Sequence, residues 1–258
     1  MSVAGRGLLR FGSPAGAKVD LFCFPYAGGN PAMFQPWKAA LPSTIYIVGV
    51  QWPGRGTEVG VPPFRRIIPL VKEIAEMLLP ELRRPFVFFG HSLGSLIAFE
   101  VTRELRRRGG IGPAHLIVSG RRAPNTANRG PLVHQLAEND FVRELQRLNG
   151  CLPGVLTNPE LLELFLPVLR ADFEMDETYI YSPAEPLDCP ITVFGGTEDH
   201  WVSPSHLRAW QAETSGQFSV RNFPGDHFFL QSAKEKVIAT VLSEISYVLA
   251  REAKDAHV

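Results

Sequence analysis

The feature that most constrains this chain is a serine between two glycines, placed where a strand ends and a helix begins. Residues 86–89 form an apolar run without alternation, which is typical of a strand buried on both faces. Apolar residues then recur at helical spacing from Leu93 onward. Between them, Gly90-His91-Ser92-Leu93-Gly94 matches G-x-S-x-G, in which the serine sits on a strained turn and the glycines let strand and helix pass closely. Ser92 is therefore a candidate nucleophile; the alternative is a glycine-rich turn with a solvated serine.

The length and composition allow a large core. The chain has 258 residues, 45% of them hydrophobic, so residues 1–258 can form a single α/β domain. A formal net charge of zero leaves no global electrostatic footprint for nucleic acid or an anionic membrane. The start lacks the apolar core of a signal peptide and no run approaches a membrane span, so we expect a cytoplasmic protein. We also expect the protein to be a monomer. Cys23, Cys151 and Cys189 lack the close spacing of metal ligands, so we expect free thiols and no metal.

Strand and helix patterns alternate along most of the chain, which predicts a mostly parallel sheet flanked by helices. The expected strands span residues 19–24, 44–52, 86–89, 114–119, 191–194 and 218–223. The expected helices begin at residue 31 or span residues 67–79, 93–108, 205–212 and 230–251. The segment before residue 19 is expected to begin loosely.

The alternation stops between residues 121 and 188, where the pattern is helical without a convincing strand. The helical stretches are 132–136, 141–148 and 159–181, and Pro167 must kink the last of them or begin a new helix. Because the insertion lies between two strands of the sheet, it predicts a helical lid over the carboxyl ends of the strands. The alternative is that these helices only extend the core.

A serine hydroxyl is a poor nucleophile, so it needs a base, and the base needs an orienting carboxylate. In the α/β-hydrolase fold the chain order is serine, then Asp or Glu, then His. Asp199 follows the strand after the insertion, and His227 lies in the loop after the last strand. We therefore predict a catalytic triad of Ser92, Asp199 and His227.

Other titratable residues are candidates for the same roles. Glu198 could replace Asp199 as the acid, and His200 could replace His227 as the base. Asp226 is interpreted as a turn residue, and His91 is expected to pack beneath the nucleophile. The remaining candidates lie in the insertion, on other elements or in the tail: Asp172, Asp176, Asp188, His115, His134, His206 and His257.

Negative charge on the attacked carbonyl oxygen needs hydrogen-bond donors. The N–H of Leu93 lies at the start of the helix after the nucleophile, where the helix dipole also favours an anion. The loop Pro25-Tyr26-Ala27-Gly28-Gly29 follows the first long strand, so we assign the N–H of Ala27 as the second donor. The alternative is an ordinary connection between strand and helix.

Arginines within residues 103–108 end the helix that follows Ser92. Positive charge at a helix C-terminus complements the helix dipole, and the glycines at 109 and 110 are a normal stop. The alternative is a docking patch for an acidic partner.

Five motifs together resemble those of the type II thioesterases, which are stand-alone editing enzymes of polyketide and nonribosomal peptide synthesis. The motifs are F-P-Y-A-G-G (24–29), Q-W-P-G-R-G (51–56), G-H-S-L-G (90–94), G-G-T-E-D (195–199) and G-D-H-F-F-L (225–230). The resemblance implies an α/β-hydrolase fold with a mobile helical lid. It also implies hydrolysis of acyl thioesters on the phosphopantetheine arm of a carrier protein, with no cofactor of the enzyme's own. One departure is Ser95, where the family pattern often has alanine.

The motifs leave other activities open. The same triad would serve an esterase or lipase for small oxoesters, since the thioester preference rests on the resemblance. A catalytically silent module that binds an acyl carrier is a second alternative. A third is transfer of the acyl group to an alcohol or amine instead of water.

Overall fold

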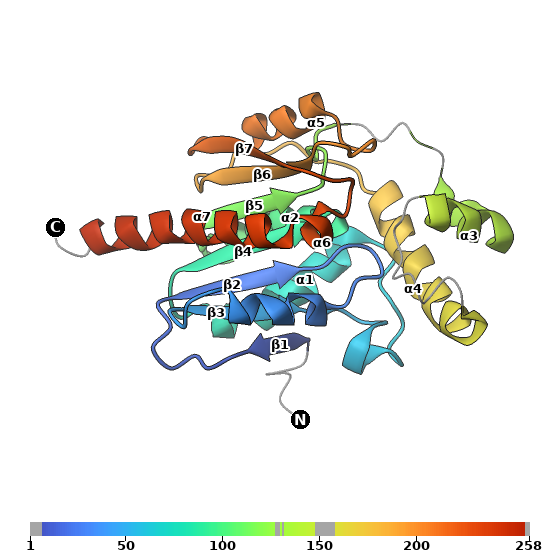
Figure 1. The fold of residues 1–258 in the computed structure, drawn as a ribbon, viewed down its shortest axis with the longest axis horizontal. Coiled ribbons are helices and arrows are strands. Elements are labelled where there is room, and N and C mark those ends of the chain that lie inside the picture. Colours follow the sequence, from blue (N-terminus) through green and yellow to red (C-terminus); the bar gives the residue numbers. More distant parts are fainter. Residues whose placement is uncertain (1–6, 127–129, 131, 148–157, 256–258) are drawn as a thin grey trace.

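The structure is a computed structural model that describes residues 7–126, 130, 132–147 and 158–255. Seven strands form one sheet in the order β1-β3-β2-β4-β5-β6-β7 (Figure 1). Their bounds are β1 Leu8–Phe11, β2 Val19–Phe24, β3 Ile45–Val50, β4 Phe86–His91, β5 His115–Ser119, β6 Ile191–Gly196 and β7 Phe218–Phe223. β1 is antiparallel to β3, and every other neighbouring pair is parallel. The expected mostly parallel sheet is therefore confirmed.

Helices cover both faces of this sheet (Figure 1). The α-helices are α1 Ile67–Leu78, α2 Leu93–Gly109, α3 Glu138–Arg147, α4 Pro159–Glu177, α5 Pro204–Arg208, α6 Phe229–Ser232 and α7 Lys234–Asp255. The 3₁₀ helices are η1 Pro31–Ala39, η2 Gly56–Glu58, η3 Leu79–Glu81, η4 Val133–Gln135 and η5 Ala209–Glu213. Within the described ranges, no helix has the length and apolar composition that crossing a bilayer requires.

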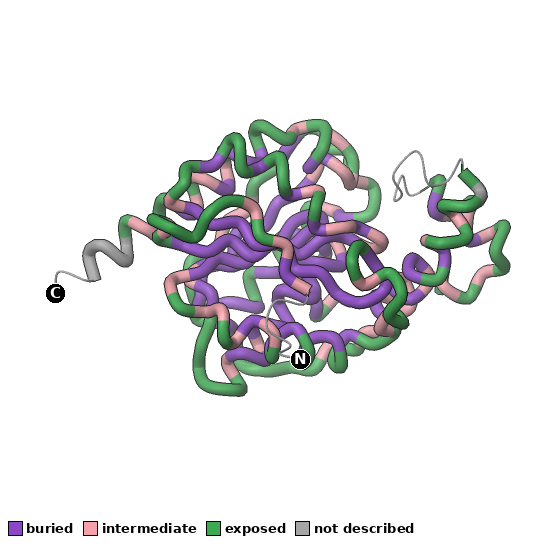
Figure 2. Tube along the Cα trace, turned by 90° about the horizontal axis from the view of Figure 1, so that it is seen from below, coloured by how far each residue is buried: buried purple, intermediate pink, exposed green. Residues whose placement is uncertain are grey.

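The strands lack alternation because the sheet is buried on both sides. In β2, Phe22 and Phe24 pack into a core with α1 and α2, while Leu21 and Cys23 pack into a second core with η1 and α7. Figure 2 shows the buried strands running through the middle of the molecule, with exposed segments outside them. A period of two therefore separates two apolar cores here, and not an apolar face from a polar one.

The N-terminal segment is more ordered than expected. Residues 8–11 form β1, which pairs with β3 at the edge of the sheet, Leu8 opposite Val50 and Phe11 opposite Ile47. The expectation of a loose start falls partly on residues 1–6, which lie outside the described residues, and it was wrong for residues 8–11. Strand β1 was missed because it is only four residues long and its partner lies far along the chain. A pattern of local residues does not report such a non-local pairing.

Three of the expected helices differ in detail from the expectation. The helix that begins at residue 31 has 3₁₀ geometry and contains Pro36. Asn30 caps its N-terminus, where the side-chain oxygen accepts the N–H of Ala32 at 2.8 Å. In the insertion, α4 continues through Pro167 as one helix, so no new helix begins there. The end of the chain divides into a short α6 and a long α7.

The parallel strands end at one edge of the sheet, and the insertion lies beyond that edge, on the right of Figure 1. Because β4 and β5 run in the same direction, α2 must return from this edge to the opposite one. The loops after β2, β4, β5, β6 and β7 therefore meet beneath α4.

We expect acid to destabilise this fold through a buried histidine, His115. Its Nε2 lies 2.9 Å from Oγ1 of Thr192, and burial lowers its pKa from 6.5 to about 4, although Oε2 of Glu244 is 3.9 Å away. Between these pH values the unfolded chain binds a proton that the folded chain does not. The free energy of unfolding should therefore fall with decreasing pH, by up to about 1.4 kcal/mol per pH unit for this group.

The measurement is urea unfolding of the wild type and His115→Gln at pH 7, 6 and 5. Glutamine can donate to Thr192 but does not titrate, so the stability difference between the two proteins should shrink as the pH falls. His200→Gln, at an exposed position, is the control and should track the wild type. Parallel curves for the wild type and His115→Gln would contradict the prediction.

Candidate active site

The turn at Ser92 has the strained geometry that its motif requires. Ser92 has φ 53° and ψ −118°, and among the described residues it alone has a positive φ without being glycine. Such a conformation costs of order 1–3 kcal/mol and persists where its surroundings hold it. A Cβ at Gly94 would overlap the carbonyl oxygens of Phe24 and Pro25, and one at Gly90 would overlap the Gly94 carbonyl. Glycine is therefore required on both sides of Ser92.

Two buried serines hold the turn against the neighbouring strand. The N–H of Ser92 donates to the carbonyl of Ser119 at 2.8 Å. Oγ of Ser95 lies 2.7 Å from the Gly90 carbonyl and accepts the N–H of Ser119 at 3.0 Å. The serine that departs from the family pattern thus joins the turn to the end of β5, a contact that alanine could not make.

The structure brings Ser92, His227 and Asp199 into one chain of contacts. Nε2 of His227 is 3.1 Å from Oγ of Ser92, and Nδ1 of His227 is 2.8 Å from Oδ2 of Asp199. The Asp199 side chain is completely buried, and its Oδ1 accepts the N–H groups of Trp201 at 2.8 Å and Val202 at 3.2 Å. These backbone donors hold the carboxylate in place, so it can orient the imidazole.

The alternative acid and base lie elsewhere. Glu198 and His200 are both exposed, and neither contacts Ser92 or His227 in the described part of the chain. Asp226 forms the expected turn, accepting the N–H of Phe228 at 2.8 Å.

His91 packs beneath the site, as expected. Its ring lies 5.3 Å from that of His227, centroid to centroid, and its Nδ1 is 2.9 Å from Oγ of Ser119. Complete burial, followed by the nearby His227, holds the pKa of His91 well below its usual value. His91 is therefore a neutral support under His227 and adds no charge to the site.

The two predicted donors, Leu93 and Ala27, both lie close to Ser92: Leu93 follows it in the chain, and Ala27 lines the same cavity. Leu93 is the first residue of α2, so its N–H has no acceptor within the helix. Within the ranges that the structure describes, neither the Leu93 nor the Ala27 N–H donates to a protein acceptor. The loop that carries Ala27 is closed by a bond from the Gly29 N–H to the Tyr26 carbonyl at 2.8 Å.

A cavity of about 160 Å³ lies over Ser92 and is partly roofed by α4. Its lining is Tyr26, Ala27, Ser92, Gly120, Arg121, Arg122, Phe173, Asp176, Trp201, Val202, His227 and Phe228. The two arginines and the α4 residues of this lining were not predicted from the sequence. Arg121 pairs with Asp176, and both arginines directly follow β5. That position at the carboxyl edge of the sheet is the signal that could have revealed them.

A second cavity, of about 350 Å³, lies between the end of β3 and α1, with Trp52, Glu73 and Met77 in its walls. It contains neither Ser92 nor His227. No three His, Cys, Asp or Glu side chains lie together as metal ligands within the described residues.

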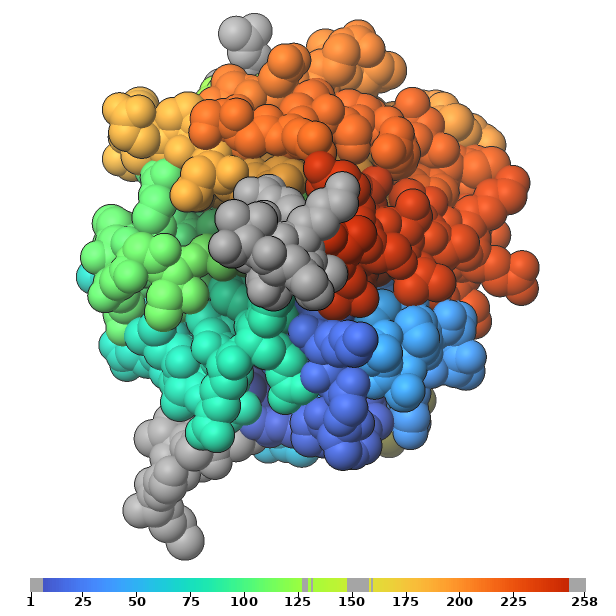
Figure 3. All heavy atoms as spheres, turned by 90° about the vertical axis from the view of Figure 1, so that its left-hand side faces the viewer, coloured from blue at the N-terminus to red at the C-terminus, as the bar shows by residue number. Residues whose placement is uncertain are grey.

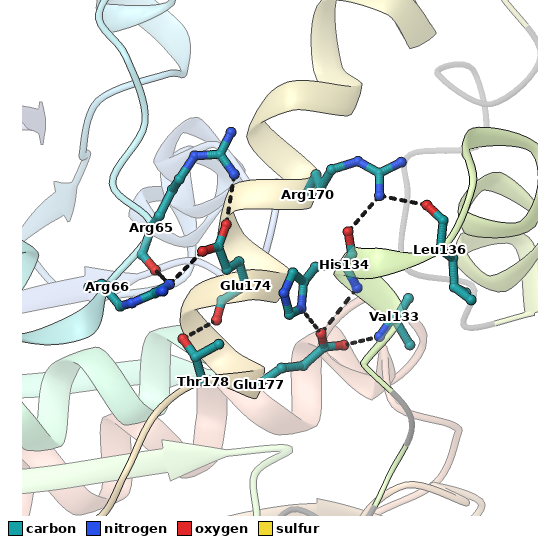
Figure 4. Close-up of polar contacts among 9 residues, drawn as sticks. All are labelled: Arg65, Arg66, Val133, His134, Leu136, Arg170, Glu174, Glu177 and Thr178. Atoms are coloured by element: carbon teal, nitrogen blue, oxygen red, sulfur yellow. Dashed lines mark hydrogen bonds and ion pairs between the residues drawn. The ribbon is translucent and has the colours of Figure 1, made fainter.

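α4 organises the lid through polar contacts (Figure 4). The Glu177 carboxylate accepts the N–H groups of Val133 at 2.9 Å and His134 at 3.1 Å. Arg170 donates to the carbonyls of His134 at 2.6 Å and Leu136 at 2.8 Å. Side chains of α4 therefore bind both N–H groups and carbonyl groups in and beside the η4 segment.

Two further contacts join the lid to the body of the protein. Glu174 of α4 pairs with Arg65 at 2.7 Å and with Arg66 at 2.5 Å, as Figure 4 shows. At the end of α3, the guanidinium of Arg147 lies 4.6 Å from the ring centroid of Trp201 at the cavity wall. The lid thus rests on the body at both of its helices.

The sequence interpretation set Asp172 aside with the rest of the insertion, and the structure places it in contact with the loop that carries Ala27. Its side chain is completely buried, and its Oδ2 accepts the N–H of Gly28 at 2.6 Å. Arg55 donates to both carboxylate oxygens, at 2.9 and 2.7 Å. Nε1 of Trp52 lies 3.4 Å from Oδ1.

Comparison with known proteins gives a consistent family. The Thioesterase domain family matches residues 19–245. The chain is 40% identical over 247 residues to a Brevibacillus parabrevis protein named linear gramicidin dehydrogenase LgrE, covering 95% of this chain and 94% of the relative. It is 41% identical over 234 residues to the gramicidin S biosynthesis protein GrsT of Aneurinibacillus migulanus, covering 91% of each. The solved structure of BorB, a type II thioesterase from the borrelidin biosynthetic cluster, superposes with a TM-score of 0.85 at 32% identity, covering 94% of this chain and 99% of BorB.

These matches, with the parallel sheet and the serine at the strand-to-helix turn, define an enzyme of the α/β-hydrolase fold. The chain belongs to the thioesterase family. The resemblance to type II thioesterases that the five motifs indicated is confirmed.

We expect Gly94→Ala to disable Ser92 without any change to the serine itself. The added methyl would collide with the backbone of β2 and displace the turn, which moves Oγ away from His227. The readout is labelling of Ser92 by a fluorophosphonate, with unfolding followed in parallel. Gly109→Ala, on the same helix with no atom near the new methyl, is the matched control and should be labelled at the wild-type rate. Normal labelling of Gly94→Ala would contradict this account of the turn.

Proposed function

We propose that this protein hydrolyses acyl thioesters held on the phosphopantetheine arm of carrier proteins, through an acyl-enzyme formed on Ser92. The observation that carries the proposal is the contact chain from Ser92 to His227 to Asp199 at a lidded cavity, in a chain of the thioesterase family. Ser92 would act as nucleophile, His227 as general base and Asp199 as the group that orients His227.

In the first step, Nε2 of His227 accepts the Ser92 proton as Oγ attacks the thioester carbon. The carbonyl oxygen becomes negative and accepts hydrogen bonds from the N–H groups of Leu93 and Ala27. The carbon–sulfur bond then breaks, and the imidazolium returns the proton to the departing sulfur. A thiol with a pKa near ~8.5 leaves more readily than an alcohol, so little help from the general acid is needed.

In the second step, water replaces the thiol. His227 accepts a proton from the water, whose oxygen attacks the acyl carbon, and the same proton then passes to Oγ of Ser92 as the ester breaks. The products are a free acid and the regenerated serine. Ser92, His227 and the backbone donors supply the nucleophile, the base and the anion site, so the proposed reaction needs no cofactor.

The names of the relatives support the choice of substrate. GrsT is named for gramicidin S biosynthesis and BorB as a type II thioesterase of a biosynthetic cluster, so we propose carrier-bound acyl groups of a comparable synthase as substrates. The activity in the name of LgrE is a dehydrogenase, which we do not propose, because a Ser–His–Asp contact chain is the constellation of acyl transfer. All three side chains come from one chain, which supports action as a monomer. The described cysteines, Cys23 and Cys189, are free thiols, which supports the cytoplasm as its location.

We propose that the carrier approaches at the lid edge of the sheet and not at the arginines that end α2. Those arginines lie at the far end of a helix of 17 residues, about 25 Å from Ser92 at ~1.5 Å per residue. That end lies on the face away from α3 and α4, which Figure 3 shows from the left of Figure 1. The arginines also have partners within the protein. Arg103 pairs with Glu100, Arg107 and Arg108 pair with Glu104, and Arg106 donates to the carbonyls of Glu185 and Pro186.

We expect Ser92→Ala to abolish hydrolysis while leaving the fold intact, because it removes only the attacking oxygen. Release of free thiol from acyl-pantetheine and from an acyl-loaded carrier protein is the measurement. Ser246→Ala, at an exposed serine of α7, is the matched control and should retain wild-type turnover. Retained thioester turnover in Ser92→Ala would contradict the assignment.

The same assays separate the remaining activities. Turnover of p-nitrophenyl esters above that of acyl-pantetheine would indicate an oxoester hydrolase. Carrier binding without turnover of any thioester would indicate a silent binding module. Mass spectrometry of the carrier and the released acid would reveal transfer to an alcohol or amine.

A further inference from the structure

We propose that Asp172 of the lid helix α4 is a positioning residue. It holds the Ala27 N–H in the direction from which this group donates a hydrogen bond to the carbonyl oxygen of the substrate. The proposal rests on the proposed function, since it concerns the anion site of the same reaction. It is carried by the 2.6 Å bond from the Gly28 N–H to Oδ2 of Asp172, one residue after the proposed donor.

Asp172 fixes the loop because it accepts the N–H next to the one that must stay free. Ala27 lines the cavity beside Ser92, whereas Gly28 donates away from it, to the lid. Of these two successive N–H groups, only that of Gly28 has an acceptor in the described part of the protein. If the Asp172 bond is lost, the Gly28 peptide can rotate, and the Ala27 N–H that precedes it loses its fixed direction.

The same turn of α4 also packs directly on Gly28. Gly28 has φ 71°, which favours glycine, and a Cβ at this position would overlap the side chain of Leu169. Leu169 and Asp172 are three residues apart, so they lie on one face of α4. One helix face thus supplies both an apolar contact and a charged acceptor to a single loop residue.

Arg55 fixes the orientation of the Asp172 carboxylate. The two side chains are 1% and 0% exposed, and both guanidinium nitrogens Nη1 and Nη2 donate to the carboxylate. Nη1 also lies 3.3 Å from the Gly29 carbonyl, and the guanidinium stacks over the Trp52 ring, 4.3 Å from its centroid. A bidentate pair of this kind has one geometry, so it sets the direction from which Oδ2 meets the Gly28 N–H.

The consequence is that the lid does more than cover the cavity. The turn of α4 between residues 168 and 172 completes the anion site, so this turn must be seated for the transition state to be stabilised. The bond between Asp172 and Gly28 acts on the developing oxyanion through the Ala27 N–H. Its loss should therefore lower kcat and leave KM for the thioester nearly unchanged.

The test compares Asp172→Asn with Glu174→Gln. Glu174 lies on the same helix and pairs with Arg65 and Arg66, so its substitution removes a charge of α4 while leaving the Asp172–Arg55 pair and the bond to Gly28 in place. For Asp172→Asn we expect kcat on acyl-pantetheine to fall about 10- to 100-fold, less than the 10²–10³ that removal of an oxyanion donor costs. KM should stay within about twofold, and Glu174→Gln should stay within about twofold in both constants.

Binding of an alkyl trifluoromethyl ketone gives a second readout that a purely structural role would not move. This ketone forms a tetrahedral adduct with Ser92 whose oxygen occupies the anion site, whereas a non-reactive thioether analogue of the substrate does not. Asp172→Asn should weaken the ketone by the same factor as kcat and leave the thioether unchanged. Equal ketone affinity in Asp172→Asn and wild type, or equal losses in Asp172→Asn and Glu174→Gln, would overturn the proposal.

Two further arms keep these outcomes distinct. If circular dichroism shows that Asp172→Asn does not fold, Arg55→Lys takes its place, because it retains a buried cation but loses the two-pronged hold on Asp172; a smaller loss of ketone affinity is expected, and no loss overturns the proposal. If the wild type hydrolyses no acyl thioester, the proposed function fails. The ketone comparison then still tests Asp172, since adduct formation requires only Ser92 and the anion site.

Discussion

The site depends on one backbone constraint: Ser92 must be held at a positive φ between a buried strand and a buried helix. The strain of order 1–3 kcal/mol is small beside what the sheet buries, but it has to be borne locally. Glycine at 90 and 94 lets α2 pass close to the end of β2, and the bonds from Ser92 and Ser95 to Ser119 fasten the turn to β5. Since β2, β4 and β5 are parallel neighbours, the same packing that holds the turn also brings the Ala27 loop and the residues after β5 beside it. The nucleophile and its surroundings are therefore assembled by a single close contact among three strands and one helix.

Local signals were sufficient for the parts that follow from this constraint. The apolar run before Ser92, the helical spacing after it and the loops that close the later strands are all short-range patterns, and the parallel sheet then dictates that their ends meet. Asp199 and His227 could be proposed because each follows a predicted strand and because their order in the chain fits the fold. β1 could not be found in this way, because four residues without a turn signal acquire their structure only from β3.

The largest omission was Asp172, and its cause is physical. A lone carboxylate on a helix usually indicates a solvated face, and its partner Arg55 lies 117 residues earlier in a loop. Only the folded chain brings the two charges together. One signal was present, since Asp172 continues at a spacing of three the apolar stripe that includes Leu169. A charge on the buried stripe of an amphipathic helix predicts a buried partner, because an unpaired buried carboxylate is too costly to keep. Arg121 and Asp176 escaped notice for the same reason, as a pair between a sheet edge and the lid.

The contacts that hold the lid to the body differ in strength along the length of the lid. α4 is held to the body by the buried pair of Asp172 with Arg55 and by the pairs of Glu174 with two arginines. α3 instead packs on α4 through a small separate core that includes Phe141 and Leu145, and it meets the loop after β6 through Arg147 over the exposed ring of Trp201. An exposed cation–π contact contributes only about 0.5–1 kcal/mol. The contact at Trp201 is therefore weaker than the buried pair of Asp172 with Arg55, which holds α4 next to Gly28. If the proposed role of Asp172 is correct, α3 can separate from the loop after β6 while α4 stays against the Ala27 loop, because the two helices are held to the body by different contacts.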